Sequence, residues 1–192
     1  METPQSLRTL CERFLPVETE RFVIGIPVLS QMMGFQAELG TAELARLTCR
    51  PIKERTNEER EALYAAALED AGLLTLGIQE SGGGFVTSAP IFGRISVFDF
   101  NPRNKSAEFG YVLLPSRRQQ GIMKDALRAV CHMLLRDAGL NKLYAQTGAF
   151  NEPSVALLKA LGFHLDGTLR EHHALDGVLY DDLVFSLLKK EL

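Results

Sequence analysis

The stretch Leu114-Pro-Ser-Arg-Arg-Gln-Gln-Gly-Ile-Met123 decides the fold, because it joins a strand pattern directly to the strongest helix pattern in the chain. A helix N-terminus offers unpaired backbone N–H groups and a partial positive charge, which together favour an anion. Arg117 and Arg118 add charge beside that end, and Gly121 lets a ligand approach the backbone closely. Taken alone, the stretch leaves two interpretations open: a junction that binds a phosphate-bearing ligand, or an ordinary basic turn before a helix on the protein surface.

The segments on either side of this junction fix the middle of the sheet. Residues Ala107–Leu114 form a predicted strand that Pro115 ends. At 100° per residue, the apolar side chains of the following helix fall within one arc of roughly 140°, and Gly139 ends that helix. Leu143–Thr147 is the next strand, and the helix between the two strands predicts that they are parallel neighbours. The apolar side chains of the arc are Ile122, Met123, Ala126, Leu127, Val130, Met133 and Leu134.

The N-terminal part contributes a strand, helices and two further strands. Residues 19–26 form a short predicted strand, and residues 28–72 are mostly helical. The last of these helices has a capping box at Thr56 and Glu59 and is expected to end at Gly72. Leu73–Gln79 and Phe92–Phe100 then form strands whose tight connections predict antiparallel pairing.

The C-terminal part contributes a short helix and a long hairpin. The helix runs from about Pro153 to Leu161, with Asn151 or Glu152 at its N-cap. Two strands, Phe163–Leu175 and Val178–Leu188, flank a two-residue Asp-Gly turn. The order of elements predicts an α+β fold: one mixed sheet of about six to seven strands with N-terminal helices, central parallel strands and a C-terminal β-hairpin.

The totals indicate one domain over residues 1–192, because no repeat or linker divides the chain. The net charge of −3 argues against a general nucleic-acid binder. Three scattered cysteines predict reduced thiols rather than disulfides. Since the chain shows neither an apolar run of about 18 residues nor the pattern of a signal peptide, we expect a cytoplasmic protein that does not insert into membranes.

Three motifs resemble the GNAT acetyltransferase superfamily, in the RimJ/RimL-like branch of ribosomal-protein-alanine acetyltransferases. The first is Arg118-Gln-Gln-Gly121-Ile-Met123, similar to the family's pyrophosphate motif Arg/Gln-x-x-Gly-x-Gly/Ala, with methionine at the last position. The second is Ala107-Glu-Phe-Gly-Tyr-Val-Leu-Leu-Pro115, and the third is Asn151-Glu-Pro-Ser154 followed by Leu161-Gly-Phe163. The resemblance covers roughly residues 73–188.

This resemblance implies an acetyl-CoA-dependent N-acetyltransferase, with acetyl-CoA as co-substrate and a small-molecule or peptide amine as acceptor. It also implies that the two central parallel strands splay apart beyond the junction and that the amine attacks the thioester directly, without an acyl-enzyme. The backbone near Val112–Leu114 is expected to pair with the pantetheine arm and to face the developing oxyanion. The cofactor-binding residues are expected to be Val112, Leu113, Leu114, Arg117, Arg118, Gln119, Gln120, Gly121, Ile122, Met123, Asn151 and Ser154.

Glu108 is the candidate general base, because it lies on the strand that lines the expected cleft and an amine must be neutral to attack. The alternative interpretation of Glu108 is an ordinary, half-exposed carboxylate on a strand. Many relatives carry a tyrosine four residues beyond the serine of the third motif, where this chain has Leu158. Ser154 is therefore the candidate hydrogen-bond donor to the departing thiolate, and its alternative is a helix-start residue.

Two other readings of the same residues remain open. One is a GNAT-like module that binds an acyl-CoA without catalysis, and the other is a transferase that uses a larger donor such as succinyl-CoA. No metal is expected, because no Cys, Asp or Glu completes a ligand spacing with His164, His172 and His173. The family often forms homodimers, but the sequence alone does not decide the oligomeric state.

Overall fold

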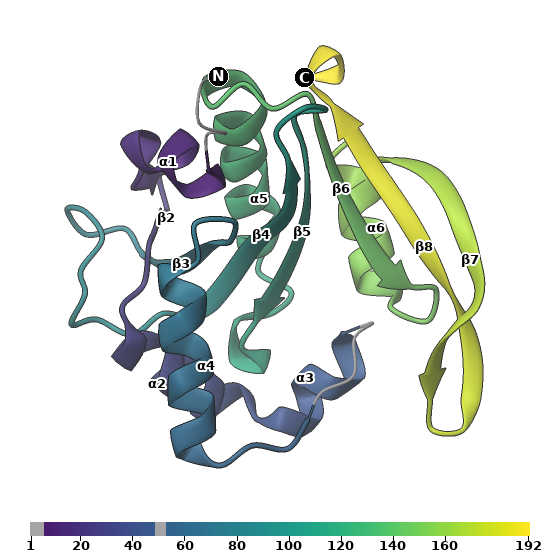
Figure 1. Cartoon of the computed structure of the whole chain (residues 1–192), viewed down its shortest axis with the longest axis horizontal. Helices are drawn as coiled ribbons and strands as arrows, with labels where there is room; N and C mark the ends of the chain where they lie inside the picture. Colours follow the sequence, from purple (N-terminus) through teal and green to yellow (C-terminus); the bar gives the residue numbers. More distant parts are fainter. Residues whose placement is uncertain (1–5, 49–52) are drawn as a thin grey trace.

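The computed structural model describes residues 6–48 and 53–192, apart from the side chains of Glu43 and Leu47. Cys49 lies outside the described residues. The described chain forms one mixed sheet of eight strands in the order β1-β2-β3-β4-β5-β6-β8-β7, with helices packed against it (Figure 1). The strands are β1 Val17–Glu18, β2 Phe22–Gly25, β3 Leu74–Glu80, β4 Gly93–Asn101, β5 Ser106–Leu113, β6 Lys142–Gly148, β7 His164–Leu175 and β8 Val178–Leu188.

The α+β fold predicted from the sequence is confirmed, and one more strand is present than expected. The additional strand is the two-residue β1, which pairs antiparallel with β2 through Val17 and Ile24. A strand this short has no alternating pattern of its own, so the sequence gives no signal for it. The helices are α1 Leu7–Cys11, α2 Leu29–Leu39, α3 Thr41–Leu47, α4 Asn57–Glu69, α5 Ile122–His132 and α6 Glu152–Ala160.

Neighbouring strands pair antiparallel everywhere except at β5 and β6, which are parallel as the connecting helix predicted. The C-terminal hairpin of β7 and β8 turns at Asp176 and Gly177, also as predicted. The capping box of α4 is confirmed too: Glu59 N–H donates to the Thr56 hydroxyl, and Thr56 N–H donates to the Glu59 carboxylate.

One predicted helix end differs from the structure, and a second helix ends as predicted but with a turn of unexpected form. Helix α4 ends at Glu69 rather than at Gly72, because Asp70 takes an extended conformation and its carboxylate accepts a hydrogen bond from the Gly72 N–H at 2.7 Å. The long helix does stop before Gly139, but its last turn, Met133–Asp137, is a wide π-helical turn closed by Ala138 N–H donating to Met133 O at 2.8 Å. The extra residue in that turn keeps both Leu134 and Leu135 in the core.

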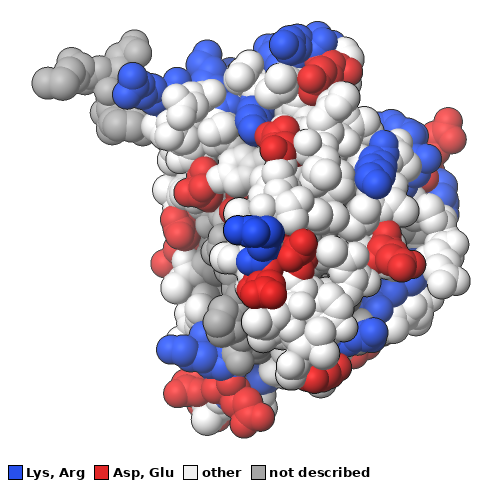
Figure 2. Space-filling model, turned by 90° about the vertical axis from the view of Figure 1, so that its right-hand side faces the viewer, with Lys and Arg blue, Asp and Glu red and all other residues white. Residues whose placement is uncertain are grey.

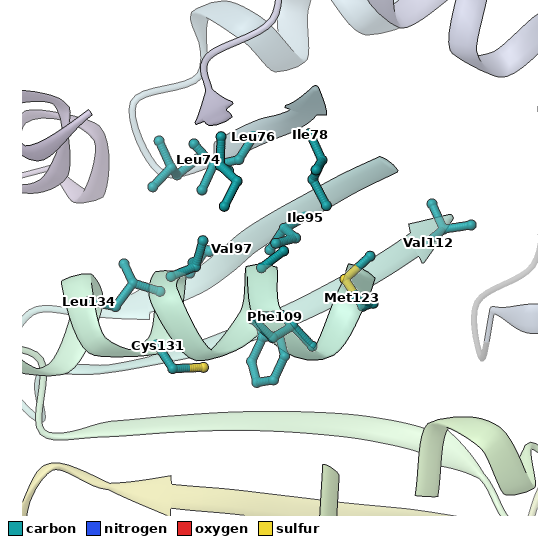
Figure 3. Close-up of a cluster of buried hydrophobic side chains, with 14 of the residues drawn as sticks. Leu74, Leu76, Ile78, Ile95, Val97, Phe109, Val112, Met123, Cys131 and Leu134 are labelled. Carbon is teal, nitrogen blue, oxygen red and sulfur yellow. The ribbon is translucent and has the colours of Figure 1, made fainter. Parts of the chain in front are cut away.

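The core that fixes the position of the junction lies between α5 and the middle of the sheet. Figure 3 shows Met123 and Cys131 of α5, and Leu134 of the π-helical turn that follows it, facing side chains of β3, β4 and β5. All apolar residues of the predicted arc are buried, so the predicted inward face of this helix is confirmed. Because α5 is held along its length, its N-terminus is fixed against the end of β5.

Candidate functional site

The central feature of the site is the separation of β5 from β6. Residues 106–108 of β5 pair with residues 142–144 of β6, and β6 then continues along β8 as far as Gly148. The two strands run side by side at one end and diverge toward the other (Figure 1). This opening breaks the sheet on one side of β5, as the sequence predicted.

The divergence turns one edge of β5 toward open space. Leu114 N–H donates to Phe92 O on the β4 side at 3.0 Å. Since backbone groups of successive residues in a strand point to alternate sides, the N–H and C=O groups of Tyr111 and Leu113 point toward the opening, where the Leu113 C=O accepts a hydrogen bond from the Arg118 side chain at 3.2 Å. An extended ligand placed in the opening can therefore pair with the backbone of β5.

A cavity of about 880 Å³ occupies this opening and extends over the N-terminus of α5. Its volume falls in the upper part of the usual range for small-molecule sites. The cavity wall comes from β4, β5, β6, the junction, α3, α6 and β7. The residues of that wall on which the argument rests are Arg94, Glu108, Tyr111, Arg118, Gly121 and Ser154.

The N-terminus of α5 is shaped as an anion site. The first intrahelical bond runs from Asp125 N–H to Gly121 O, so the N–H groups of Ile122, Met123 and Lys124 have no acceptor within the helix. Gly121 is the N-cap and has φ +75°, a conformation that costs other residues energy. Positive charge is added by the Arg118 and Lys124 side chains, which line the same cavity. Backbone donors and cations thus converge on one end of the cavity.

The junction is held from outside by a residue far away in the sequence. Arg21, next to the start of β2, donates to Gln120 O at 3.1 Å and pairs with the Asp125 carboxylate at 3.1 Å. Arg117 pairs with Glu80 of β3 at 2.8 Å and lies over the ring of Phe92. These contacts fix the path of the loop between β5 and α5.

The structure brings nine of the residues named from the sequence to the cavity and leaves three outside its wall. Leu114 is buried in the core, Arg117 makes the ion pair just described, and the Gln120 side chain donates to Ser116 O. Met123 is buried against the sheet, which explains how a methionine fits at a position where the family motif has Gly or Ala. The nine on the wall are Val112, Leu113, Arg118, Gln119, Gly121, Ile122, Met123, Asn151 and Ser154, and Glu108 joins them.

Asn151 and Ser154 hold different positions at the start of α6. Asn151 is the N-cap, and its side-chain oxygen accepts the Ser154 N–H at 3.4 Å. The Ser154 hydroxyl instead forms a 2.7 Å hydrogen bond with the phenol of Tyr111 on β5. Burial raises the pKa of Tyr111 to about 12, and the hydrogen bond with Ser154 acts in the opposite direction. Sequence reasoning missed Tyr111, and its spacing of two residues from buried Phe109 was the available signal that both rings share a face.

Glu108 lies on the other face of the sheet. It stands opposite Phe98 of β4, while Arg94 of β4 stands opposite Val112 of β5. Directly opposed residues share a face, so Arg94, Ser96 and Glu108 line the same side of the cavity. The Arg94 guanidinium also lies 6.0 Å from the ring centroid of Phe35 on α2. This side, under α2 and α3, is distinct from the side formed by α5 and α6.

The three histidines do not gather. His164 and His172 are exposed, and His172 lines the cavity. His173 is buried, with Nδ1 3.5 Å from the carboxylate of fully buried Asp182. That carboxylate also accepts a hydrogen bond from Gln146, which lines the cavity, at 2.7 Å. The hydrogen bond between Gln146 and Asp182 therefore joins β6 to β8 behind the cavity wall, and His173 of β7 packs beside it. Over residues 6–48 and 53–192, no cluster of three or more His, Cys, Asp or Glu side chains has an arrangement that suits a metal ion.

The family described as Acetyltransferase (GNAT) domain matches residues 22–164. Ribosomal-protein-serine acetyltransferase of Escherichia coli (strain K12) is 33% identical over 93 residues, which are 48% of this chain and 51% of that protein. The N-acetyltransferase p20 of Bacillus licheniformis is 34% identical over 88 residues, which are 46% of this chain and 49% of that protein. The chain thus spans about half the length of the curated relatives it matches.

Solved structures share the fold over nearly the whole chain. Spermidine N-acetyltransferase from Vibrio cholerae, in complex with CoA and spermine, has a TM-score of 0.79 at 16% identity and covers 90% of this chain and 98% of its own. The RimL ribosomal L7/L12 alpha-N-protein acetyltransferase, in complex with coenzyme A, has a TM-score of 0.76 at 19% identity, with coverage of 91% and 97%. At these identities the likeness establishes the fold alone.

Proposed function

The chain belongs to the GNAT acetyltransferase family, and we propose that it transfers the acetyl group of acetyl-CoA to a primary amine, either a protein N-terminus or the amine of a small molecule. The observation that carries the proposal is the cavity that joins the opened edge of β5 to the N-terminus of α5. We further propose that residues 1–192 act as one domain and work in the cytoplasm, where acetyl-CoA is available.

The residues present fit acetyl-CoA as co-substrate. The N–H groups of Ile122, Met123 and Lys124, with the Arg118 side chain, suit a diphosphate. The backbone of Tyr111 and Leu113 suits an extended amide chain such as pantetheine. A backbone N–H of this edge is also placed to face the oxygen on which charge develops, a contact often worth about 3 kcal/mol.

Glu108 supplies the base in this proposal. The amine nitrogen attacks the thioester carbon, its surplus proton passes to the Glu108 carboxylate directly or through a water, and the C–N bond forms as the C–S bond breaks. The electron pair goes to the sulfur, which receives a hydrogen bond from Ser154 and takes its proton from solvent after release. An α-amine with a pKa near 8 needs this base less than a lysine amine near 10.4.

The first test of the proposal is calorimetric titration with acetyl-CoA, free CoA and 3′-dephospho-CoA, followed by thiol release with a panel of acceptors. The panel contains a free peptide N-terminus, an N-terminally blocked peptide with one lysine, and spermidine. Saturable acetyl-CoA binding with turnover of one acceptor class is expected. Binding without turnover of any amine would identify a non-catalytic module, and faster turnover with succinyl-CoA would identify a larger donor. Millimolar acetyl-CoA without binding would refute the proposal.

A further inference from the structure

The position four residues after Ser154, where many relatives have a tyrosine, is taken by a leucine that contributes nothing to the cavity. Leu158 is 0% exposed and packs in the core beneath α6. It does not belong to the cavity wall. A hydroxyl group for the departing sulfur must therefore come from another element of the fold.

Tyr111 brings a phenol to this region from β5 instead of from α6. Its hydroxyl oxygen lies 2.7 Å from the Ser154 hydroxyl oxygen, and both residues line the cavity. The ring is stacked against Phe109, with centroids 5.9 Å apart, and Phe109 is itself buried. The phenol is thus held from behind by the core of α5 and β5, so its hydroxyl has a fixed position.

The hydroxyl protons of this pair can be counted. Two hydroxyl groups carry two protons, and the bond between them uses one. Either oxygen can donate in this pair; because a phenol is the more acidic group and the better donor, we take Tyr111 as the donor and Ser154 as the acceptor. The Ser154 proton then remains to donate into the cavity. Accepting a bond strengthens a hydroxyl as a donor, since hydrogen bonds in a chain polarise one another.

We propose that Tyr111 is a positioning residue for the transfer reaction: its hydroxyl donates to Ser154 and holds the Ser154 hydroxyl proton toward the sulfur of the departing CoA. The inference rests on the proposed function, because it assigns a group to the leaving side of that reaction. Tyr111 approaches from β5 and Ser154 from α6, so the pair joins the two sides of the opening next to the edge where the thioester would lie.

The state of the phenol agrees with this role. With its pKa raised to about 12 by burial, Tyr111 remains protonated at neutral and moderately alkaline pH. Cys131 of α5, also close to the phenol, is neutral as well, because burial raises the pKa of its thiol to about 12. No proton needs to leave Tyr111, since the pair stabilises the thiolate by donating a hydrogen bond. The CoA sulfur leaves with its electron pair and is protonated by solvent.

The test uses Tyr111→Phe, with Tyr64→Phe as the matched control. Tyr64 of α4 is buried and donates a 2.6 Å hydrogen bond to Gln36 of α2, away from the cavity wall. The readout is the pKa of the thiol in bound free CoA, followed by thiolate ultraviolet absorbance. The wild-type protein should hold this pKa about one unit below its value in free CoA in solution, and Tyr111→Phe should return most of that shift. Tyr64→Phe should leave it unchanged.

Kinetics supply an independent readout. Tyr111→Phe should lower kcat about tenfold while the Kd for acetyl-CoA, which has no free thiol, stays within about twofold. Ser154→Ala should lower kcat similarly, and the double variant should lose little more than either single variant, because the two hydroxyls act as one unit. This serine variant also tests the pair if Tyr111→Phe does not fold.

Three results would overturn the inference: an unchanged thiol pKa in both hydroxyl variants, additive losses in the double variant, or full kcat in Tyr111→Phe. Failure of the proposed function looks different, because a wild-type protein that binds CoA but acetylates no amine would still show the lowered thiol pKa. The inference and the proposed function can therefore fail separately.

Discussion

Replacing Gly121 with alanine tests the anion site at the start of α5 most directly. Gly121 is the N-cap with φ +75°, and a Cβ added there would meet no atom closer than Arg21 Nη1 at 3.8 Å. The substitution therefore creates no clash within the protein. It introduces a left-handed backbone strain and places a methyl group on the cavity wall, beside the N–H groups that an anion would contact.

The strain can be separated from the loss of binding with a second glycine. Gly139 has φ +79°, has no atom within 4 Å of an added Cβ, and is not on the cavity wall. Alanine in the left-handed region costs about 1–2 kcal/mol, so both variants should lose similar stability, with Tm falling roughly 2–4 °C for each kcal/mol. Gly121→Ala alone should also lose a hydrogen bond to a charged oxygen, worth about 1.5–3 kcal/mol, or about 10- to 100-fold in affinity.

Calorimetric titration of both variants with acetyl-CoA, free CoA and 3′-dephospho-CoA measures this difference. All three ligands carry the diphosphate, so Gly121→Ala should weaken them by the same factor, while Gly139→Ala should bind all three like the wild-type protein. Equal affinity in the two glycine variants would show that the diphosphate does not approach the α5 N-terminus. A loss shared by acetyl-CoA and free CoA but absent with 3′-dephospho-CoA would place the contact at the 3′-phosphate instead.

Three further outcomes are expected. Glu108→Gln should lower kcat/KM about 10²- to 10³-fold for a lysine-like amine in thiol-release assays, and the loss should be largest at low pH. An equal loss of kcat/KM at every pH would contradict the role of Glu108 as a base. Asp182→Ala, which removes the buried acceptor of the Gln146 side-chain N–H, should lower the free energy of unfolding by about 1–3 kcal/mol in urea titrations. Asp137→Ala, at an exposed carboxylate, should change it by about 0.5 kcal/mol or less, and equal losses would contradict this. Burial raises the pKa of the Cys11 and Cys131 thiols to about 12. In mass spectrometry both thiols should therefore remain unalkylated in the native protein at pH 8 and react once urea unfolds the chain. Rapid alkylation of either thiol in the native protein would contradict its burial.

The sequence was informative wherever a pattern is local. Four features follow one another within about 40 residues: the strand of β5, the two arginines of the junction, the apolar arc of α5 and the strand of β6. The parallel pairing of β5 with β6 and the inward face of the helix could therefore be predicted. The Asn151 cap could be predicted for the same reason, since a cap acts within one turn.

Contacts between distant elements could not be predicted in this way. Tyr111 meets Ser154 only because α6 packs behind the opening, and Arg21 reaches Gln120 only because β2 lies beside the junction. The error in the predicted C-terminus of α4 has a local cause. A glycine is a common stop signal, but the Asp70 side chain accepts the Gly72 N–H and forms a turn, so the helix ends before Asp70. Three residues were named as cofactor-binding only because they lie close to the motif in the sequence. In the structure Leu114 is buried in the core, Arg117 pairs with Glu80, and the Gln120 side chain donates to Ser116 O, so none of them lines the cavity.

The divergence of β5 from β6 also bears on self-association. A sheet usually has unpaired backbone only at its two outer strands, and such rims invite pairing with other chains. Here Tyr111 and Leu113 turn backbone groups toward an opening inside the sheet, and the Leu113 carbonyl already accepts a hydrogen bond from the Arg118 side chain at 3.2 Å. This edge lies within the cavity and not at the outer strands β1 and β7, so it is less exposed to pairing with another copy of the protein. An extended ligand bound along it should slow amide exchange at Tyr111 and Leu113.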